Sequence, residues 1–161
     1  MYKTEAIITK VENFKENHLS ISVYSSQYGQ KSLVVFGGKS KKKNTTYVKG
    51  SFNNIEFDNN NVCLSSTSIN TFKWFLFSKY ELKTIDYFCF LIDKLLFLAD
   101  QNSNVVSYYL LLIAKLNARS NYLPELLLLE LEILKASGYQ PDLNESVLKK
   151  IFNFHDKSNL K

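Results

Sequence analysis

The sequence is poor in cysteine: Cys63 and Cys89 are the two such residues among 161. Two cysteines cannot form a disulfide framework, and they are too few for the four-ligand sites that hold structural zinc. Each lies among apolar residues, so we interpret both as thiols of the core. We therefore expect no disulfide scaffold, no bound metal and no other cofactor.

Long hydrophobic runs are also missing. The stretch MYKTEAIITKVENFKE at residues 1–16 contains acids early and no apolar run of signal-peptide length. The longest uncharged stretch of the C-terminal half, residues 101–114, is shorter than the ~20 apolar residues needed to cross a bilayer. These features predict a cytoplasmic protein without a membrane partner.

The motifs of common enzyme classes do not occur. The stretch GGKSKKK lacks the spacing of a P-loop, and there is no HExxH, GxSxG or paired-cysteine pattern. A surface role is the simpler interpretation of both histidines, His18 and His155. Glu125, Glu130 and Glu132 lie in a leucine-rich segment, where we expect them on the solvent side or in pairs within a helix. The sequence therefore predicts a protein that is not an enzyme and has no catalytic residue.

Positive charge is concentrated near the N-terminus. The whole chain has a formal net charge of +5 and a pI of about 9.1. Residues 1–50 hold nine lysines and three acids, a net of +6, whereas residues 51–161 have a net of −1. This asymmetry indicates an electrostatic role for the N-terminal part, and its sign suits nucleic acid or anionic lipid.

The N-terminal seventy residues have the pattern of short strands. Residues 18–25, HLSISVYS, place apolar side chains at positions 19, 21 and 23, the period of a half-buried strand. The runs EAIITKV, SLVVFGG, NNIEFD and VCLSS also have strand length, and no proline interrupts them. Five such strands joined by polar turns predict a small closed or nearly closed β-barrel.

Helical spacing begins after residue 70. Ile85, Cys89 and Ile92 recur at helical intervals, and residues 105–114 are almost entirely apolar. In LPELLLLELEILKAS, Pro124 stands in the first turn and Gly138 follows the end, which are start and stop signals. A last amphipathic helix is predicted over residues 144–154. We therefore expect an α+β protein with a β-barrel at residues 1–70 and an all-α helical domain at residues 71–161.

A cluster of lysines follows the third predicted strand. In residues 34–47, VVFGGKSKKKNTTY, a turn needs the two glycines but not the four lysines. The cluster is either an ordinary solvated loop or a surface for an anionic ligand. Small barrels that bind single strands combine a basic groove with aromatic stacking platforms. Aromatic residues lie close by in the sequence, at Tyr24, Tyr28, Phe36 and Tyr47.

Two stretches carry motifs of a single family. Residues 4–43 begin with the apolar strand TEAIITKV and end with GGKSKKK, and residues 128–143, LLELEILKASGYQPDL, contain a GYxPxL element. In both stretches the sequence resembles RecO, the bacterial recombination mediator, and the two lie in the family's order. The matching positions are Ala6, Ile7, Ile8, Leu19, Val23, Tyr24, Ser25, Tyr28, Gly29, Val34, Gly37, Leu134, Gly138, Tyr139, Pro141 and Leu143.

The resemblance implies a fold and a role in DNA repair, recombination and the response to DNA damage. The implied fold is an OB-fold barrel followed by a helical domain. The implied activities are binding of single-stranded and double-stranded DNA, strand annealing, and recombinase loading on DNA coated by the single-strand-binding protein SSB. The implied protein partners are RecR and the C-terminal tail of SSB. Many family members continue from the GYxPxL element into a cysteine-based zinc module. Here no cysteine follows Cys89, so zinc is not carried over and the chain is interpreted as a short form.

The resemblance and the charge pattern together predict the DNA-binding residues. Lysines would contact phosphates, which positions a strand without reading its sequence, and tyrosines would stack on bases. The predicted phosphate contacts are Lys31, Lys39, Lys41, Lys42, Lys43 and Lys49, and the predicted stacking residues are Tyr24, Tyr28 and Tyr47.

A second predicted site would bind the SSB tail. Lys115 and Arg119 are four residues apart and would share one helix face. Leu112 and Leu116 would supply the apolar part of the same surface. The alternative function is a reduced protein-interaction module, which would act through the helical domain without useful DNA binding.

Overall fold

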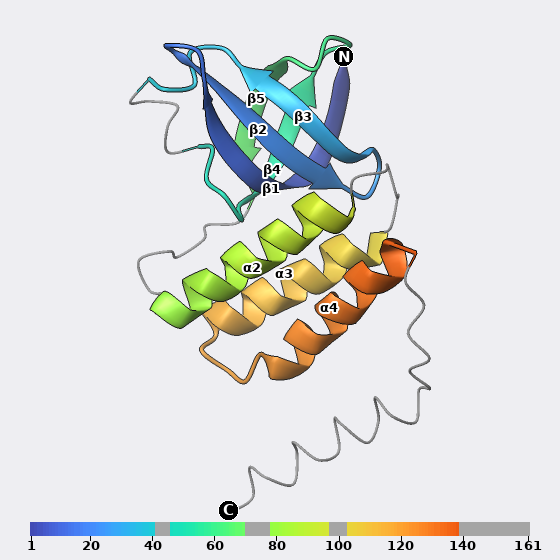
Figure 1. Cartoon of the computed structure of the whole chain (residues 1–161). Helices are drawn as coiled ribbons and strands as arrows, with labels where there is room; N and C mark the ends of the chain where they lie inside the picture. The colour runs from blue at the N-terminus through green and yellow to red at the C-terminus, as the bar shows by residue number, and fades with distance from the viewer. Residues whose placement is uncertain (41–45, 70–77, 97–102, 139–161) are drawn as a thin grey trace, which may run out of the picture.

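The computed structural model describes residues 1–40, 46–69, 78–96 and 103–138, and it arranges them as a β-barrel beside a layer of three helices (Figure 1). The α+β class is therefore confirmed. The strands are β1 (Tyr2–Phe14), β2 (His18–Ser25), β3 (Gly29–Val35), β4 (Phe52–Phe57) and β5 (Cys63–Ser68), and the helices are α2 (Lys79–Leu95), α3 (Ser103–Asn117) and α4 (Leu123–Ala136). The predicted domain boundary at residues 70–71 and the predicted helix at 144–154 lie outside the described residues.

The five strands form one antiparallel sheet in the order β3-β2-β1-β4-β5. A parallel bridge between Val34 and Val62 joins the two edges, so that the sheet closes on itself. Closure satisfies the edge strands, which would otherwise expose unpaired backbone groups. The predicted OB-fold barrel is confirmed by this topology. β1 is longer than predicted because it pairs with β4 along its first half and with β2 along its second.

The barrel interior is filled by residues that alternate along the strands. On β2, Leu19, Ile21 and Val23 are buried as predicted. They pack in one cluster with residues of the other strands, including Ile8 and Ile55. Burial of each such side chain stabilises the barrel by about 1.5–3 kcal/mol.

The outside of the barrel is also buried where the helices cover it. Ile7 on β1 pairs with Tyr24 on β2 and with Phe52 on β4, so the three side chains form a row across three strands. All three belong to the same hydrophobic cluster as the buried residues of α2, α3 and α4. The row explains why Ile7 and Ile8, neighbours in the chain, are both buried: they face two different cores.

Polar contacts fix the helical layer to the barrel. The hydroxyl of Tyr109 in α3 donates a hydrogen bond of 2.8 Å to the carbonyl oxygen of Gly50. On α2, Asp86 forms a 2.7 Å ion pair with Lys49, and the Asp93 carboxylate accepts a 3.0 Å hydrogen bond from the Gln30 amide. These contacts join the two parts of the molecule at three places.

The helix boundaries follow the sequence signals. The Ser78 side chain caps α2, and Glu81 returns a bond to the Ser78 backbone, forming a capping box. Pro124 lies in the first turn of α4, and Gly138, with φ of 84°, follows its end. The positive φ explains glycine at this position, because other residues adopt it at a cost.

Candidate nucleic-acid interface

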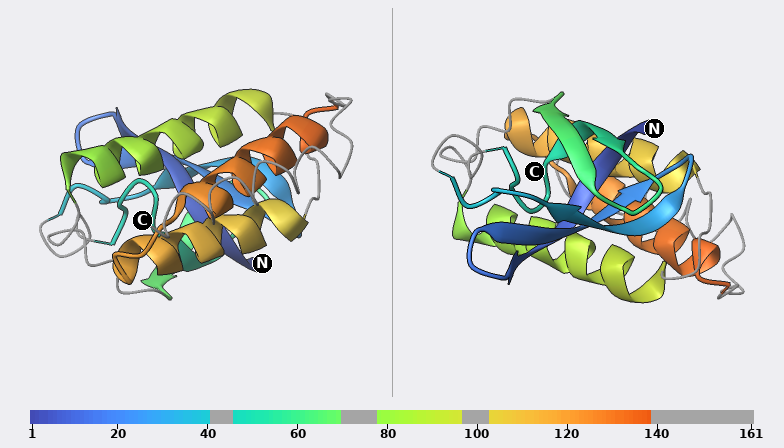
Figure 2. Two further views of the ribbon diagram at one scale, coloured as in Figure 1. Left: turned by 90° about the horizontal axis from the view of Figure 1, so that it is seen from below. Right: turned by 90° about the horizontal axis from the view of Figure 1, so that it is seen from above.

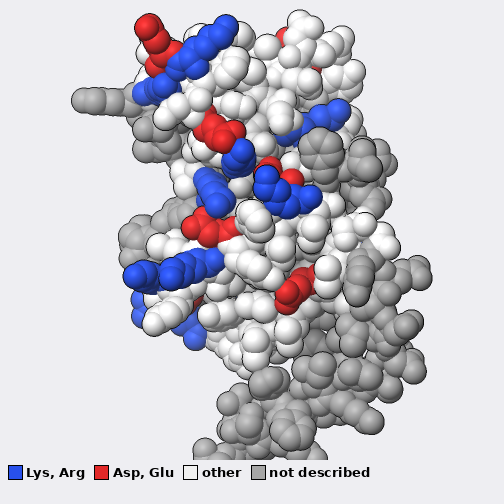
Figure 3. Space-filling model, viewed as in Figure 1, with Lys and Arg blue, Asp and Glu red and all other residues white. Residues whose placement is uncertain are grey.

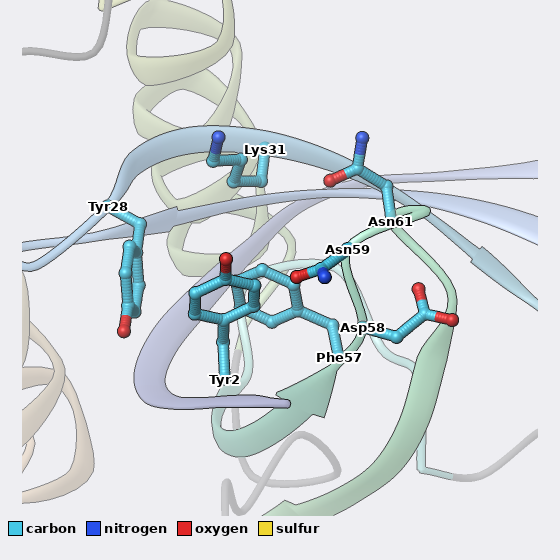
Figure 4. Close-up of a pocket in the computed structure, with 7 residues that line it drawn as sticks. All are labelled: Tyr2, Tyr28, Lys31, Phe57, Asp58, Asn59 and Asn61. Atoms are coloured by element: carbon cyan, nitrogen blue, oxygen red, sulfur yellow. The ribbon is translucent and has the colours of Figure 1, made fainter.

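Three aromatic rings meet at one mouth of the barrel (Figure 4). Tyr2 stacks on Phe57 with ring centroids 5.2 Å apart and an interplanar angle of 25°. Tyr28 stands edge-on to both rings, 5.7 Å from Tyr2 and 5.6 Å from Phe57. Phe57 is buried, whereas Tyr2 is 40% exposed. A nucleobase placed on Tyr2 would therefore extend a stack of rings whose lowest member, Phe57, is fixed in the barrel core.

The rings border a cavity of about 340 Å³. Its lining comes from the start of β1, the β2–β3 turn, β3, the end of β4 and the β4–β5 turn: Tyr2, Tyr28, Lys31, Phe57, Asp58, Asn59 and Asn61. Figure 4 shows Lys31 between Tyr28 and Asn61, above the ring of Tyr2. The cavity therefore brings a cation and amide groups to the edge of an aromatic surface.

The β4–β5 turn that lines the cavity is fixed by its own hydrogen bonds. The Asp58 carboxylate accepts bonds from the backbone N–H groups of Asn60 and Val62, at 2.9 and 2.8 Å. Asn61 adopts a φ of 58°, a conformation that asparagine tolerates better than most residues. The turn therefore holds the side chains of Asn59 and Asn61 at the mouth without a ligand.

A second basic and aromatic cluster lies at the other end of the β2–β3 hairpin. The Lys39 ammonium donates a 2.9 Å hydrogen bond to the carbonyl oxygen of Lys15, and the Lys15 ammonium lies 5.4 Å from the Phe14 ring. His18 packs edge-on against Phe36, and its Nδ1 accepts a hydrogen bond from the Gly37 backbone. Phe14 is 39% exposed and Phe36 53% exposed. These rings and lysines form a rim beside the end of β3, the strand that the lysine cluster follows in the sequence.

The two glycines of this rim occupy positions that other residues would fit poorly. Gly37 adopts a φ of 66°, and a Cβ at Gly38 would lie 2.9 Å from the Leu19 side chain. The chain therefore turns sharply after β3, as the sequence predicted. Lys41, Lys42 and Lys43 lie outside the described residues, so their predicted role stays a prediction.

Two of the predicted stacking residues are buried, and the prediction was wrong for both. Tyr24 has no exposed surface because the helical layer covers it. Tyr47 is 7% exposed, with its hydroxyl 3.8 Å from the Cys63 sulfur, and burial raises its pKa above the ordinary value. A base cannot reach either ring in this structure. Tyr28 is half-buried at the cavity and remains a candidate.

The predicted lysines have different surroundings. Lys31 is half-buried at the cavity and Lys39 lies at the rim. Lys49 is paired with Asp86 at the junction with α2, which gives it a structural role. On the face shown in Figure 3, acidic side chains lie among the basic ones where barrel and helices meet.

The predicted surface for an SSB tail does not form as expected. Leu112 and Leu116 are 0% and 1% exposed, inside the core of the helical layer. Lys115 pairs with Glu125 of α4 at 3.6 Å. Arg119 lies beyond the end of α3 with a φ of 51°, so it does not continue the helix face of Lys115. The prediction failed because α3 is apolar on nearly all sides, and its sequence does not reveal which leucines face outward.

The structure also shows the surroundings of the cysteines and of Glu130, which the sequence analysis considered. Both cysteines are buried thiols outside any disulfide, as the sequence predicted, and burial raises the pKa of Cys89 to about 12. Glu130 accepts a hydrogen bond from Tyr87 on α2, so it contacts a neighbouring helix and does not simply face solvent. Within the described ranges, no cluster of three or more His, Cys, Asp or Glu side chains could hold a metal ion.

Comparison with known proteins places the barrel in a family. Residues 1–68 match the family model "Recombination protein O N terminal". The barrel is a RecO N-terminal domain. This match confirms the predicted resemblance for the barrel and supports a RecO-like role in DNA repair and recombination. The match ends with β5, so the helices and the GYxPxL element lie outside it.

No curated protein matches the chain. In the described part of the chain, none of the helices has the length and apolar character that a membrane span requires.

The sequence did not identify the cavity because its residues are distant in the chain. Tyr2 and Phe57 come together because they are register partners of β1 and β4. Phe14, Lys15 and His18 join Phe36 and Lys39 in the same way, through the pairing of β1, β2 and β3. Both clusters could have been predicted by aligning the sequence with a barrel of known strand register.

Proposed function

We propose that this RecO-type chain is a non-enzymatic mediator of DNA repair that holds single-stranded DNA along the β2–β3 hairpin of its barrel. The observation that carries the proposal is the stack of Tyr2 on Phe57, walled by Tyr28 and bordered by Lys31. Aromatic platforms with adjacent cations suit single strands, because every base has a face to stack and every nucleotide a phosphate to neutralise.

The two clusters are spaced to engage one short strand. Lys31 at the cavity lies in β3, and Phe36 at the rim follows the last residue of that strand. The five positions from one to the other correspond to roughly 17 Å of extended chain. A stacked single strand would cover that length with about five nucleotides. This is within the 4–16 nucleotides that one OB-fold occupies.

The family supports the finer role. A RecO-like protein would anneal strands, bind double-stranded DNA as well, and pass SSB-coated DNA to a recombinase with RecR, in the cytoplasm. With Leu112 and Leu116 in the core, any contact with the SSB tail needs a surface other than the one predicted from sequence.

Single substitutions at the cavity test the proposal. Tyr28→Ala should weaken binding of a fluorescein-labelled oligothymidylate about five-fold or more, since a stacked base contributes at least ~1 kcal/mol. Lys31→Ala should weaken it at low salt and reduce the slope of log Kd against log salt by about 0.7. Lys135→Ala on α4 and Leu111→Ala on α3 are controls at exposed positions far from the cavity in the sequence. Cavity variants that bind like the controls would refute the site.

A further inference from the structure

The outer side of α2 carries a row of exposed aromatic and basic side chains. Tyr80, Lys83, Tyr87, Phe90 and Lys94 follow one another at intervals of three or four residues, which places them on one helix face. We call this row the α2 ridge. The buried residues of α2, Ile85, Phe88, Cys89 and Ile92, form the opposite face.

The ridge is open to solvent. Tyr80 is 77% exposed, Phe90 55% and Tyr87 42%, and both lysines are exposed. The two views in Figure 2 show α2 at one margin of the molecule, where neither the strands nor α3 and α4 cover its outer side. Three large rings exposed together on one helix mark an interaction surface better than rings scattered singly.

The acids of α2 have defined partners. Asp86 and Asp93 point to the barrel, where they bind Lys49 and Gln30, and Glu81 caps the helix start. Among the described residues, neither Lys83 nor Lys94 has an acidic partner within 4 Å. The acids therefore help to hold the helix in place. The two charged side chains of the ridge itself are lysines, and the carboxylates of Asp93 and Glu130 lie next to it.

A groove lined by three lysines and two acids borders the ridge. A cavity of about 300 Å³ separates β1 from α2. It is lined by Thr9, Lys10, Val11, Glu12, Lys49, Phe90, Asp93 and Lys94. Phe90 and Lys94 belong both to the ridge and to this groove. Lys10 and Lys49 are already paired with Glu12 and Asp86, so among the described residues Lys94 is the groove lysine without an acidic partner.

One aromatic ring of the ridge is held rigidly. The Tyr87 hydroxyl donates a 2.6 Å hydrogen bond to a Glu130 carboxylate oxygen, and its ring packs edge-on against Phe88. The bond to Glu130 raises the pKa of Tyr87 to about 12. A ring fixed in this way loses little conformational freedom when a planar group stacks on it.

From these observations we propose that the α2 ridge and its groove form a second track for single-stranded nucleic acid, separate from the barrel mouth. Alternating rings and lysines fit bases and phosphates. Lysine is depleted from the dry centres of protein interfaces, which makes a partner helix the poorer occupant. From Tyr80 to Lys94 the ridge rises roughly 21 Å, the length of about six stacked nucleotides.

The test uses the full chain and oligothymidylate long enough to reach both surfaces, about 30 nucleotides, twice the largest site of one OB-fold. The double variant Tyr80→Ala/Phe90→Ala leaves Tyr87 and its bond to α4 intact. Loss of each ring should raise Kd at least about five-fold, so the double variant should raise Kd at least about twenty-fold. Leu111→Ala, an exposed apolar residue of α3, is the matched control and should bind like the parent.

Photo-crosslinking of the unaltered protein gives a second readout that does not depend on variant folding. Oligonucleotides carrying 5-iodouracil should crosslink to Tyr80 or Phe90, identified by mass spectrometry of the peptide. This result would stand even if Tyr28→Ala showed no effect at the barrel, so the two sites can fail independently. Binding by the double variant within two-fold of the parent, with no crosslink on α2, would overturn the proposal. The proposal would also be overturned if the unaltered protein is a dimer and the double variant is a monomer, because the ridge would then be an interface between two copies of the chain.

Discussion

The hydroxyl of Tyr109 in α3 donates a 2.8 Å hydrogen bond to the carbonyl oxygen of Gly50 in the barrel, and Tyr109 is fully buried. Gly50 in turn donates its N–H to the carbonyl oxygen of Ile8 on β1, at 2.7 Å. One glycine therefore links a barrel strand to the helical layer. Burial raises the pKa of Tyr109 well above its ordinary value, so its hydroxyl keeps the proton that it donates.

Removing this hydroxyl should destabilise the whole molecule. Tyr109→Phe leaves the Gly50 carbonyl buried without its partner, which should lower the free energy of unfolding by about 1–3 kcal/mol. Tyr80→Phe, at a position that is 77% exposed, is the control and should change it by less than about 0.5 kcal/mol. Urea denaturation followed by circular dichroism measures both. Equal stability of the two variants would mean that the helical layer does not depend on this bond.

Tyr24 and Tyr28 should respond in opposite ways to substitution. Tyr24→Ala empties a fully buried site between barrel and helices and should cost about 3–5 kcal/mol of stability. Tyr28→Ala should cost only about 1–2 kcal/mol, from the lost edge contacts with Tyr2 and Phe57, but should weaken DNA binding. Thermal unfolding and anisotropy titrations together compare the two. Tight binding by Tyr28→Ala would remove it from the interface.

The contrast shows where sequence patterns were sufficient and where they were not. Alternation along β2 predicted correctly that Leu19, Ile21 and Val23 face the barrel interior. The same alternation placed Tyr24 on the outside, which is true of the barrel, but helices distant in sequence cover that outside. Local periodicity identifies the two faces of a strand and cannot tell which of them another element buries.

Helix ends were predictable for a similar local reason. Pro124 and Gly138 act through their own backbone conformations, so they mark the start and end of α4 without tertiary information. The orientation of α3 was not predictable, because apolar residues occupy nearly all of its sides. The aromatic cavity required the register of β1 with β4, which joins residues 55 positions apart.

The lysine cluster should carry much of the salt dependence of binding. Changing Lys39, Lys41, Lys42 and Lys43 to Ala should reduce the log–log salt slope by about 3 units, at roughly 0.7 per phosphate contact on single strands. All sequences should weaken alike, because phosphate contacts do not read bases. A variant with Lys149, Lys150, Lys157 and Lys161 changed to Ala loses the same charge elsewhere and is the control. Equal slopes in the two variants would mean that the cluster is only a solvated turn.

The purified protein should contain far less than one zinc per chain. Structural zinc needs four nitrogen or sulfur ligands, and the two cysteines are separately buried in different hydrophobic clusters. Elemental analysis by plasma mass spectrometry measures the metal content directly. Stoichiometric zinc that survives dialysis against a chelator would contradict this prediction.

The salt dependence of single-strand binding by the unaltered protein tests the central claim most directly. A labelled oligothymidylate titrated at two salt concentrations, about 50 and 200 mM, reports both affinity and its electrostatic part by anisotropy. We expect binding at the lower salt that weakens as salt rises, with a log–log slope of about 3 or more, equivalent to at least four phosphate contacts. No binding at the lower salt, or an affinity that salt leaves unchanged, would contradict the claim that the barrel is a single-strand DNA site.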